Sequence, residues 1–244
     1  MGQANFTNIL PDPNNLYNDV GQAAGSVGGP GYRSVKLSSK HQTQRNRTNS
    51  GRTVTRQIGA HQWEIDIEYN PMTREEFEPI YSFLLRQQGA LNSFFVSLPQ
   101  YRFPRDTNFK TNSDVNNFSP TATTNQGATN MLITVANYDS SNATHGKPRP
   151  GDIFTFDDNS VHTKTYQITN VETAADYQDA IPNNDTDKLR IYFTPPLQRQ
   201  VFTSTDLIFS NPLFRVQMKN DIQEYSLGAN GLYSFSLKLV EAQR

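Results

Sequence analysis

The most regular hydrophobic pattern of the chain lies between residues 61 and 99, where two alternating segments flank one of helical periodicity. In the first segment apolar and acidic residues alternate, which predicts a strand with one buried face and one acidic face. The apolar members are Trp63, Ile65, Ile67 and Tyr69, and the acidic members are Glu64, Asp66 and Glu68. The acidic face is suited to pairing with basic side chains on an adjacent strand.

Apolar residues then recur at spacings of three and four, as on one face of an amphipathic helix. The members of this stripe are Phe77, Ile80, Tyr81 and Leu84. Thr73 and Glu76 have the spacing of a capping box, and Gly89 is suited to the left-handed conformation that ends a helix. Together these signals predict a helix over about 73–88, in which Pro79 is the unfavourable residue.

A second strand is predicted from Leu91 to Leu98, closed by Pro99. The buried sides of the two strands and the helix stripe define the expected core of this region. That core comprises Trp63, Ile65, Ile67, Phe77, Ile80, Leu84 and Phe95.

Residues 232–240 alternate as strictly as 63–69 and follow the tight-turn dipeptide Asn230-Gly231. We therefore expect this late strand to return to the first sheet. The intervening chain contains short apolar segments at regular spacing with turn residues between them, which is typical of a small barrel or sandwich. These segments are 131–138, 153–156, 162–171 and 188–194.

The patterns predict a mainly β protein: a β-sandwich with one packed α-helix, plus an inserted small β-barrel or sandwich domain. The sandwich comprises 33–111 and 206–244, and the insertion comprises 112–205. Residues 1–32 are rich in Asn, Pro and Gly and predict an extended arm, either a disordered tail or a segment that orders against a neighbouring subunit.

Residues 33–58 carry seven basic residues, and no Asp or Glu occurs between Val20 and Trp63. The turn residues Asn49-Ser50-Gly51 predict a hairpin in which 33–44 pairs with 52–58. Its charge is compatible with a solvated face, an acidic partner protein or nucleic acid, although the aromatic residues of a single-strand binder are missing. The candidate partner interface is Arg45, Arg47, Arg52 and Arg56.

The composition of the chain excludes several kinds of functional site. The chain has a net charge of −1 and no cysteine, so disulfides and thiolate metal sites are excluded and no specific nucleic-acid binding is expected. No apolar run reaches the roughly 18 residues of a membrane span, so no membrane insertion is expected. The four histidines lack metal-ligand spacing, and no nucleophile or phosphate-binding motif occurs. We expect no catalytic residue, no metal and no cofactor.

Several segments resemble the distal-tail and minor-tail proteins of tailed bacteriophages, in particular the minor tail protein M group of lambda-like phages. The matching segments are Met72-Thr73-Arg74-Glu75-Glu76 at the helix entry, Phe83-Leu84-Leu85 in its core, Gly89 at its end, and Phe94 to Pro99 in the next strand. The series KPRPGDIF, YQITNVE and LRIYFTPPL resembles the inserted domain of longer tail proteins. Phe95 or Val96 stands where the lambda-type strand has Trp.

The resemblance implies a non-enzymatic structural protein that forms a ring, expected to be a hexamer, at the distal end of the tail tube. The ring would join the tube to the tail tip or baseplate hub. Its partners would be further copies of the chain and other tail proteins, and its location the virion tail after assembly in the host cytoplasm.

Two alternatives belong to other functional classes. The inserted domain suits a carbohydrate-binding module for host attachment, with Tyr138, Tyr166 or Tyr192 as stacking rings. The acidic strand face suits a glycan-cleaving tail enzyme, because paired carboxylates about 5–10 Å apart cleave glycosidic bonds.

Overall fold

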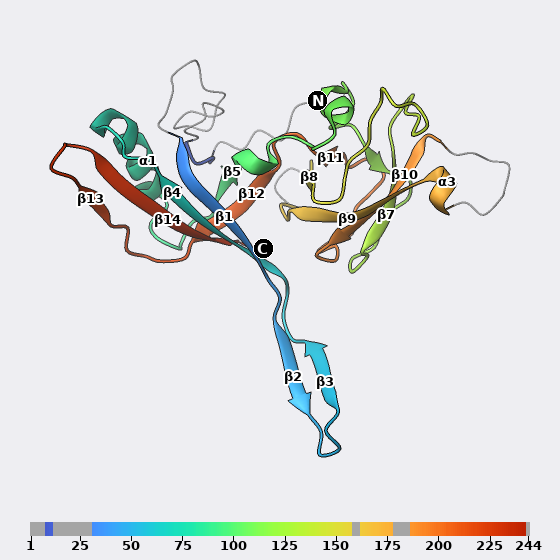
Figure 1. The fold of residues 1–244 in the computed structure, drawn as a ribbon, viewed down its shortest axis with the longest axis horizontal. Helices are drawn as coiled ribbons and strands as arrows, with labels where there is room; N and C mark the ends of the chain where they lie inside the picture. Colours follow the sequence, from blue (N-terminus) through green and yellow to red (C-terminus); the bar gives the residue numbers. More distant parts are fainter. Residues whose placement is uncertain (1–7, 12–30, 158–161, 178–185, 243–244) are drawn as a thin grey trace. The chain divides into compact units, whose positions relative to one another are not determined.

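A computed structural model describes residues 8–11, 31–157, 162–177 and 186–242 (Figure 1). The chain is mainly β, as the hydrophobic pattern predicts. It divides into two compact units, whose junctions in the chain fall at Val96/Ser97 and Phe214/Arg215. We call residues 8–11, 31–96 and 215–242 the half-barrel unit, and the described residues from 97 to 214 the barrel unit.

The half-barrel unit is built on a curved six-stranded sheet of strand order β1-β4-β14-β12-β5, with β13 pairing on β14. Its strands are β1 (Tyr32–Lys40), β4 (Gln62–Tyr69), β5 (Phe94–Ser97), β12 (Leu213–Met218), β13 (Tyr225–Leu227) and β14 (Tyr233–Glu241). The late strand β14 pairs antiparallel with β4, as predicted, with Leu237 opposite Ile67. The last strand of the unit therefore occupies the middle of the sheet.

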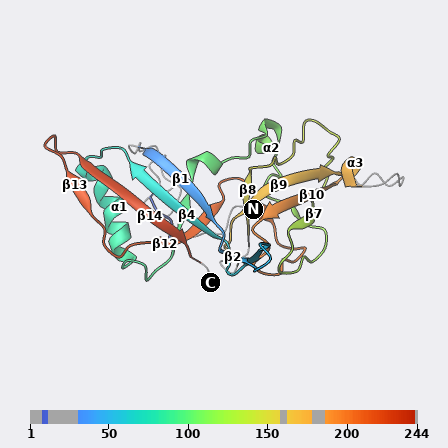
Figure 2. The same cartoon turned by 60° about the horizontal axis from the view of Figure 1, so that its bottom comes forward.

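Helix α1 (Arg74–Arg86) covers the apolar face of this sheet, where a sandwich would have its second sheet (Figure 2). Its buried residues are Phe77, Ile80, Phe83 and Leu84. Tyr81, predicted on the buried stripe, is half-buried instead, with its ring edge-on to that of Tyr225. Pro79 lies inside the helix, and Gly89 has the positive φ of +68° expected after the helix end.

All seven residues of the expected core are buried. Their exposed fractions run from 0% for Ile65 and Leu84 to 9% for Phe95. Residues 8–11 complete this core at the outer edge of β5, where Ile9 forms a parallel bridge with Phe95 and is itself buried. Part of the predicted arm therefore adds to the chain's own sheet. Tyr32, at the end of the predicted arm, begins β1, and residues 1–7 and 12–30 of the arm lie outside the described residues.

The predicted pairing of 33–44 with 52–58 is wrong for its first half. β1 pairs with β4 along its whole length, from Tyr32 opposite Tyr69 to Lys40 opposite Gln62. Only the distal segments form a separate hairpin, β2 (Thr43–Arg47) with β3 (Thr53–Gln57). The apolar residues Val35 and Leu37 explain the difference, because they align with Ile67 and Ile65 of β4 on the core side of the sheet.

The barrel unit contains a second six-stranded sheet of order β11-β8-β9-β10-β7-β6. Its strands are β6 (Ser119–Pro120), β7 (Asn130–Thr134), β8 (Ile153–Phe156), β9 (Tyr166–Thr173), β10 (Lys188–Thr194) and β11 (Leu207–Ile208). An antiparallel bridge between Phe118 and Leu207, with a 2.7 Å hydrogen bond from Leu207 N to Phe118 O, brings the first and last strands together. The sheet thereby becomes a nearly closed barrel.

Three short helical segments accompany the barrel: η1 (Pro99–Tyr101), α2 (Thr107–Thr111) and α3 (Ala174–Tyr177). In α2 the carboxylate of Asp106 accepts hydrogen bonds from the N–H groups of Asn108 and Phe109, both at 3.0 Å. This cap fixes Phe109, which is fully buried in the barrel core.

The inserted unit is longer than predicted, because it begins at 97 rather than 112 and extends to 214 rather than 205. Two residues of the barrel core, Phe109 and Phe209, show why the unit extends beyond the predicted bounds of 112–205. Both lie outside the predicted bounds, yet their rings contact each other at 5.3 Å inside the barrel core.

Candidate partner-binding surface

The four arginines of the candidate interface all lie on or next to the β2–β3 hairpin, and all four are exposed. The hairpin continues the β1–β4 ladder through a 2.9 Å hydrogen bond from Ile58 N to Gln42 O. In register, Arg45 faces Thr55, Arg47 faces Thr53, and Gln44 faces Arg56.

Strand alternation separates the arginines into two pairs, because successive side chains point to opposite faces. Arg45 and Arg47 share one face with threonines of β3, while Arg52 and Arg56 share the other face with Val54. Val54 and Ile58 are both exposed apolar residues of the same alternating set. The second face therefore combines cationic and aliphatic side chains, which is typical of a protein-binding surface.

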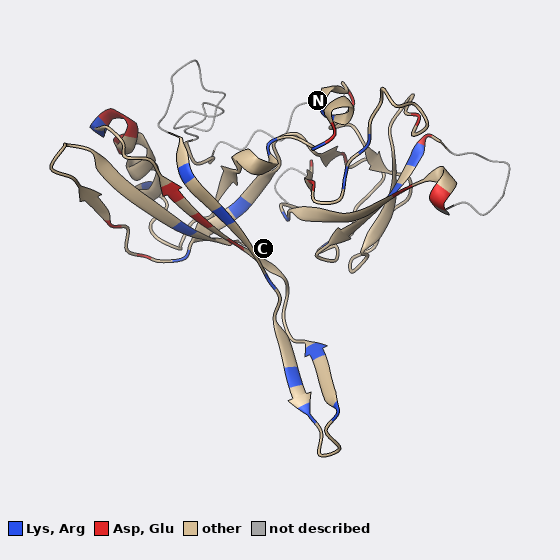
Figure 3. Cartoon of the chain, in the orientation of Figure 1, with Lys and Arg blue, Asp and Glu red and all other residues tan. Residues whose placement is uncertain are grey.

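Within the part of the chain that the structure describes, none of these four arginines has an ion-pair partner. Arg56 donates from Nε and Nη2 to Gln44 Oε1, at 3.2 and 3.0 Å. Figure 3 shows basic but no acidic residues on the hairpin. The hairpin is thus a purely cationic projection whose charge is not neutralised locally.

Aromatic side chains hold the base of the hairpin. The rings of His41 and His61 lie 4.7 Å apart, and the His61 ring lies 4.5 Å from that of Trp63, both edge to face. The Ser39 hydroxyl lies 2.9 Å from His61 Nε2 and 3.2 Å from His41 Nε2. The buried Trp63 thereby connects the core of the half-barrel unit to the start of the hairpin.

Lysines lie beside two of the three acidic residues of β4, in line with the predicted pairing to basic side chains. Glu64 accepts hydrogen bonds from Lys40 Nζ at 2.9 Å and from Lys219 Nζ at 3.0 Å. These two hydrogen bonds lower the pKa of Glu64. Asp66 lies opposite Lys36 on one side and Lys238 on the other. A glycosidase needs a carboxylic acid of raised pKa, so the lowered pKa of Glu64 does not suit it as the acid of the glycan-cleaving alternative.

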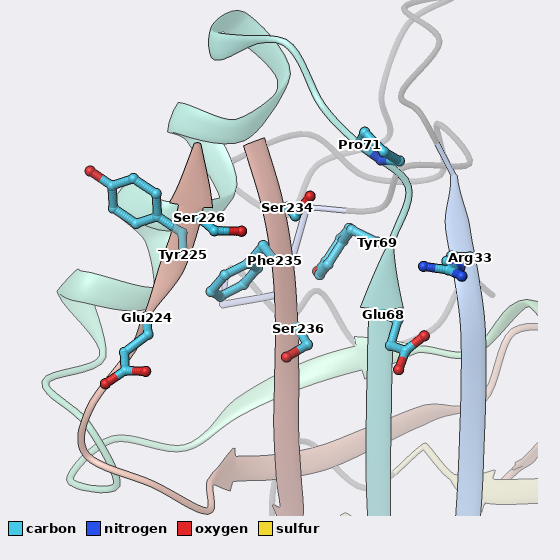
Figure 4. Close-up of a pocket in the computed structure, with 10 residues that line it drawn as sticks. All are labelled: Arg33, Glu68, Tyr69, Pro71, Glu224, Tyr225, Ser226, Ser234, Phe235 and Ser236. Carbon is cyan, nitrogen blue, oxygen red and sulfur yellow. The ribbon is translucent and has the colours of Figure 1, made fainter. Parts of the chain in front are cut away.

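A trough runs along the outer face of β14, beside this ladder (Figure 4). Its floor is formed by the small residues Ser234 and Ser236, and Glu68 and Glu224 stand on opposite sides. The first part has a volume of about 450 Å³ and is also lined by Arg33, Tyr69 and Tyr225. The second part, of about 610 Å³, shares Glu224 and Ser236 with the first and adds Asp221 and Lys238.

Sequence reasoning did not find this trough. Glu68 and Glu224 are 156 positions apart in the sequence and come together only because β14 pairs with both β4 and β13. The one sequence feature that could have indicated the trough is its charge pattern, because residues 220–237 include two acidic residues and no Lys or Arg.

Two of the three tyrosines proposed to stack on sugars are buried in the barrel unit. Tyr138 is 5% exposed and donates to Gly146 O at 2.8 Å, and Tyr166 is fully buried. Tyr192 is half-buried, with its hydroxyl 3.1 Å from a carboxylate oxygen of Glu172. The prediction of stacking rings is therefore wrong for Tyr138 and Tyr166, whose faces are covered by protein.

The described ranges contain no group of three or more His, Asp or Glu side chains placed to hold a metal ion. His162 is buried beside Phe156, with Nε2 2.6 Å from the Tyr166 hydroxyl. Burial, followed by the charge of Arg199, lowers the pKa of His162 to about 4. Across the residues placed by the structure, no helix has the length and apolar character needed to cross a bilayer.

No protein-family model matches the chain, and no curated protein sequence matches it significantly.

Proposed function

We propose that the chain is a structural protein of a phage tail, which forms a ring at the distal end of the tail tube and joins it to the tip or baseplate. The proposal rests on the resemblance of the 72–99 segment to tail proteins and on one structural observation. That observation is the β2–β3 hairpin, which carries four exposed arginines and contributes no residue to a core.

An exposed strand pair without a core is marginally stable in water unless something else supports it. Every residue of β3 is exposed, and only Gln44 in β2 is half-buried. A partner surface supplies such support by covering the hairpin and neutralising its charge. A ring of identical subunits provides this partner in every copy, together with the homo-oligomeric state that the resemblance implies.

The edge of the half-barrel unit supports the same function. Val35 and Leu37 on the edge strand β1 are only half-buried, whereas their β4 partners Ile67 and Ile65 are fully buried. The apolar face of the sheet therefore reaches its edge without complete cover from the described residues. Neighbouring subunits around a closed axis complete such a face by strand addition.

The test uses the full chain, purified and examined by sedimentation velocity and negative-stain electron microscopy. We expect closed rings of uniform size, and we expect salt to weaken them because exposed charges are screened. Substituting Arg45, Arg47, Arg52 and Arg56 by Ser should weaken assembly and reduce its salt sensitivity.

The matched control substitutes four other exposed cations by Ser: Arg86, Lys110, Lys147 and Arg199. This control removes the same charge and should assemble like the unmodified protein. A chain that remains monomeric at every concentration and salt condition would contradict the proposed function.

A further inference from the structure

The trough and the hairpin have opposite charge character on the same unit. The trough is lined by three carboxylates, Glu68, Asp221 and Glu224, and by two cations, Arg33 and Lys238. The hairpin carries four arginines and no acid. We propose that the β2–β3 hairpin of one copy docks into the trough along β14 of a second copy. This inference rests on the proposed self-assembly and specifies its contact.

Strand geometry requires that the contact be made between copies. The trough lies at the Arg33 and Glu68 end of the β1–β4 ladder, and the hairpin continues from the other end, at Lys40 and Gln62. Arg33 and Lys40 are seven residues apart on β1, which at about 3.3 Å per residue is roughly 23 Å. The hairpin extends from β1 and β4 in the direction away from β13 (Figure 1), so a chain cannot fill its own trough.

Two of the trough carboxylates are available for an incoming guanidinium group. Glu68 accepts a 3.2 Å hydrogen bond from the Ser34 hydroxyl, but among the described side chains neither Glu68 nor Glu224 forms an ion pair. Asp221 already accepts a 3.1 Å hydrogen bond from Ala90 N. Glu68 and Glu224 are therefore the expected partners of the hairpin arginines, which match carboxylates in a bidentate geometry.

The Arg52 and Arg56 face of the hairpin suits this trough best. Ser234 and Ser236 leave room on the floor, and the exposed ring of Tyr225, at the start of β13, also lines the trough. Val54 lies between the two arginines on the same face of the hairpin and provides the apolar contact. Hairpin and trough are different surfaces, so the contact is head-to-tail, and its repetition produces a ring or a filament.

Two charge reversals test this contact in the full chain. The hairpin variant carries Arg52→Glu and Arg56→Glu, and the trough variant carries Glu68→Lys and Glu224→Lys. Each variant alone should lose self-association, with the dissociation constant raised by about tenfold or more, because like charges then meet. An equimolar mixture should associate again, since each reversed surface then finds its complement.

The controls place equal charge changes on exposed residues outside both surfaces. Glu75→Lys with Asp187→Lys matches the trough variant, and Lys110→Glu with Lys147→Glu matches the hairpin variant. Both controls should associate like the unmodified chain in sedimentation velocity. Assembly of the trough variant alone, or a mixture that fails to recover, would overturn this contact while the proposed ring function stands. Only an unmodified chain that never associates would overturn both.

Discussion

The ring of Phe77 in α1 stacks on the ring of Tyr233 in β14, with centroids 4.7 Å apart and 11° between their planes. Phe77 also contacts Tyr81, Tyr225 and Phe235, so it is the centre of an aromatic cluster between helix and sheet. The helix and the last strand are 156 positions apart in the sequence. The core of the half-barrel unit therefore combines segments that precede and follow the barrel unit in the sequence.

Replacing Phe77 and Leu84 by Asp should unfold the half-barrel unit. Both side chains are buried, at 3% and 0% exposure, and each Asp would place an unpaired charge in the core. Removing a buried aromatic or leucine side chain alone costs about 2–5 kcal/mol, and the charge adds to this. Circular dichroism and thermal unfolding of the full chain measure the effect.

The neighbouring Leu85 provides the control for this substitution, because its side chain is 56% exposed on the same helix. Leu85→Asp should change the free energy of unfolding by no more than about 0.5 kcal/mol. If the double variant at Phe77 and Leu84 retains its structure, the buried side of α1 has been misidentified.

Glu76→Ala should destabilise the half-barrel unit by about 0.5–2 kcal/mol. A carboxylate oxygen of Glu76 accepts hydrogen bonds from both the N–H and the hydroxyl of Thr73, each at 2.9 Å, which holds the first turn of α1. Glu75→Ala removes the same charge from the same turn but none of these bonds. Denaturant titration compares the two, and equal midpoints would show that the cap contributes nothing.

The barrel unit should lose stability as the pH falls from about 6.5 towards 4. In the folded state the pKa of His162 is lowered to about 4, whereas an unfolded histidine titrates near 6.5. Between these values the unfolded state binds a proton that the folded state does not, so acidification favours unfolding by up to about 3 kcal/mol. Above pH 6.5 the residue is neutral in both states and adds no pH dependence.

His162→Phe isolates this effect, because it removes the titrating group and retains an aromatic ring beside Phe156. The variant also loses the contact with the Tyr166 hydroxyl, which lowers stability at every pH alike. Thermal melts at several pH values should show a smaller decline for the variant than for the unmodified chain. Parallel declines would assign the acid sensitivity to other groups.

Deleting 43–57 should abolish assembly and leave the fold intact. Gln42 and Ile58 are already paired by a 2.9 Å hydrogen bond, so a two-residue Asn-Gly turn can close the ladder between them. Since the removed side chains are exposed, apart from the half-buried Gln44, the free energy of unfolding should change by no more than about 0.5 kcal/mol. Thermal unfolding checks the fold, and sedimentation velocity checks the assembly. A large loss of stability would show that the hairpin supports the half-barrel unit itself.

The elements with strong periodicity were predicted well from the sequence. β8 and β10 have the predicted bounds, and the pairing of β14 with β4 follows from two segments of matching alternation. β4, β10 and β14 each bury one face, so their apolar residues alternate in the sequence, whereas β8 is a short apolar run buried at every residue. The helix was found for the same reason, within about two residues at each end.

The start of the barrel unit was not predicted because this part of the sequence has few apolar residues and no hydrophobic periodicity. Phe109 and Phe118 are fully buried, but each stands alone among Asn, Thr and Ser residues. Single buried aromatics leave no periodicity, and their role depends on contacts with distant residues such as Phe209. The same limit hid the trough, whose walls come from β1, β4 and β13.

The hairpin was predicted as a basic feature but with the wrong pairing. Local turn residues identified the turn at 49–51 correctly, with Gly51 at a φ of +82°. The strand β1 pairs with β4, which lies beyond the turn and offers buried isoleucines to its apolar residues. This pairing was favoured over a longer local hairpin with residues 52–58.

The segments of the half-barrel unit are synthesised at two separate times, before and after the barrel unit. Residues 97–214 form a contiguous compact unit that can fold as soon as it leaves the ribosome, whereas β4 must wait for β14. The cationic hairpin is thus made early and the trough floor late. A nascent chain can therefore present its hairpin to another copy before its own trough exists. Another copy can dock into that trough only after β14 has been translated.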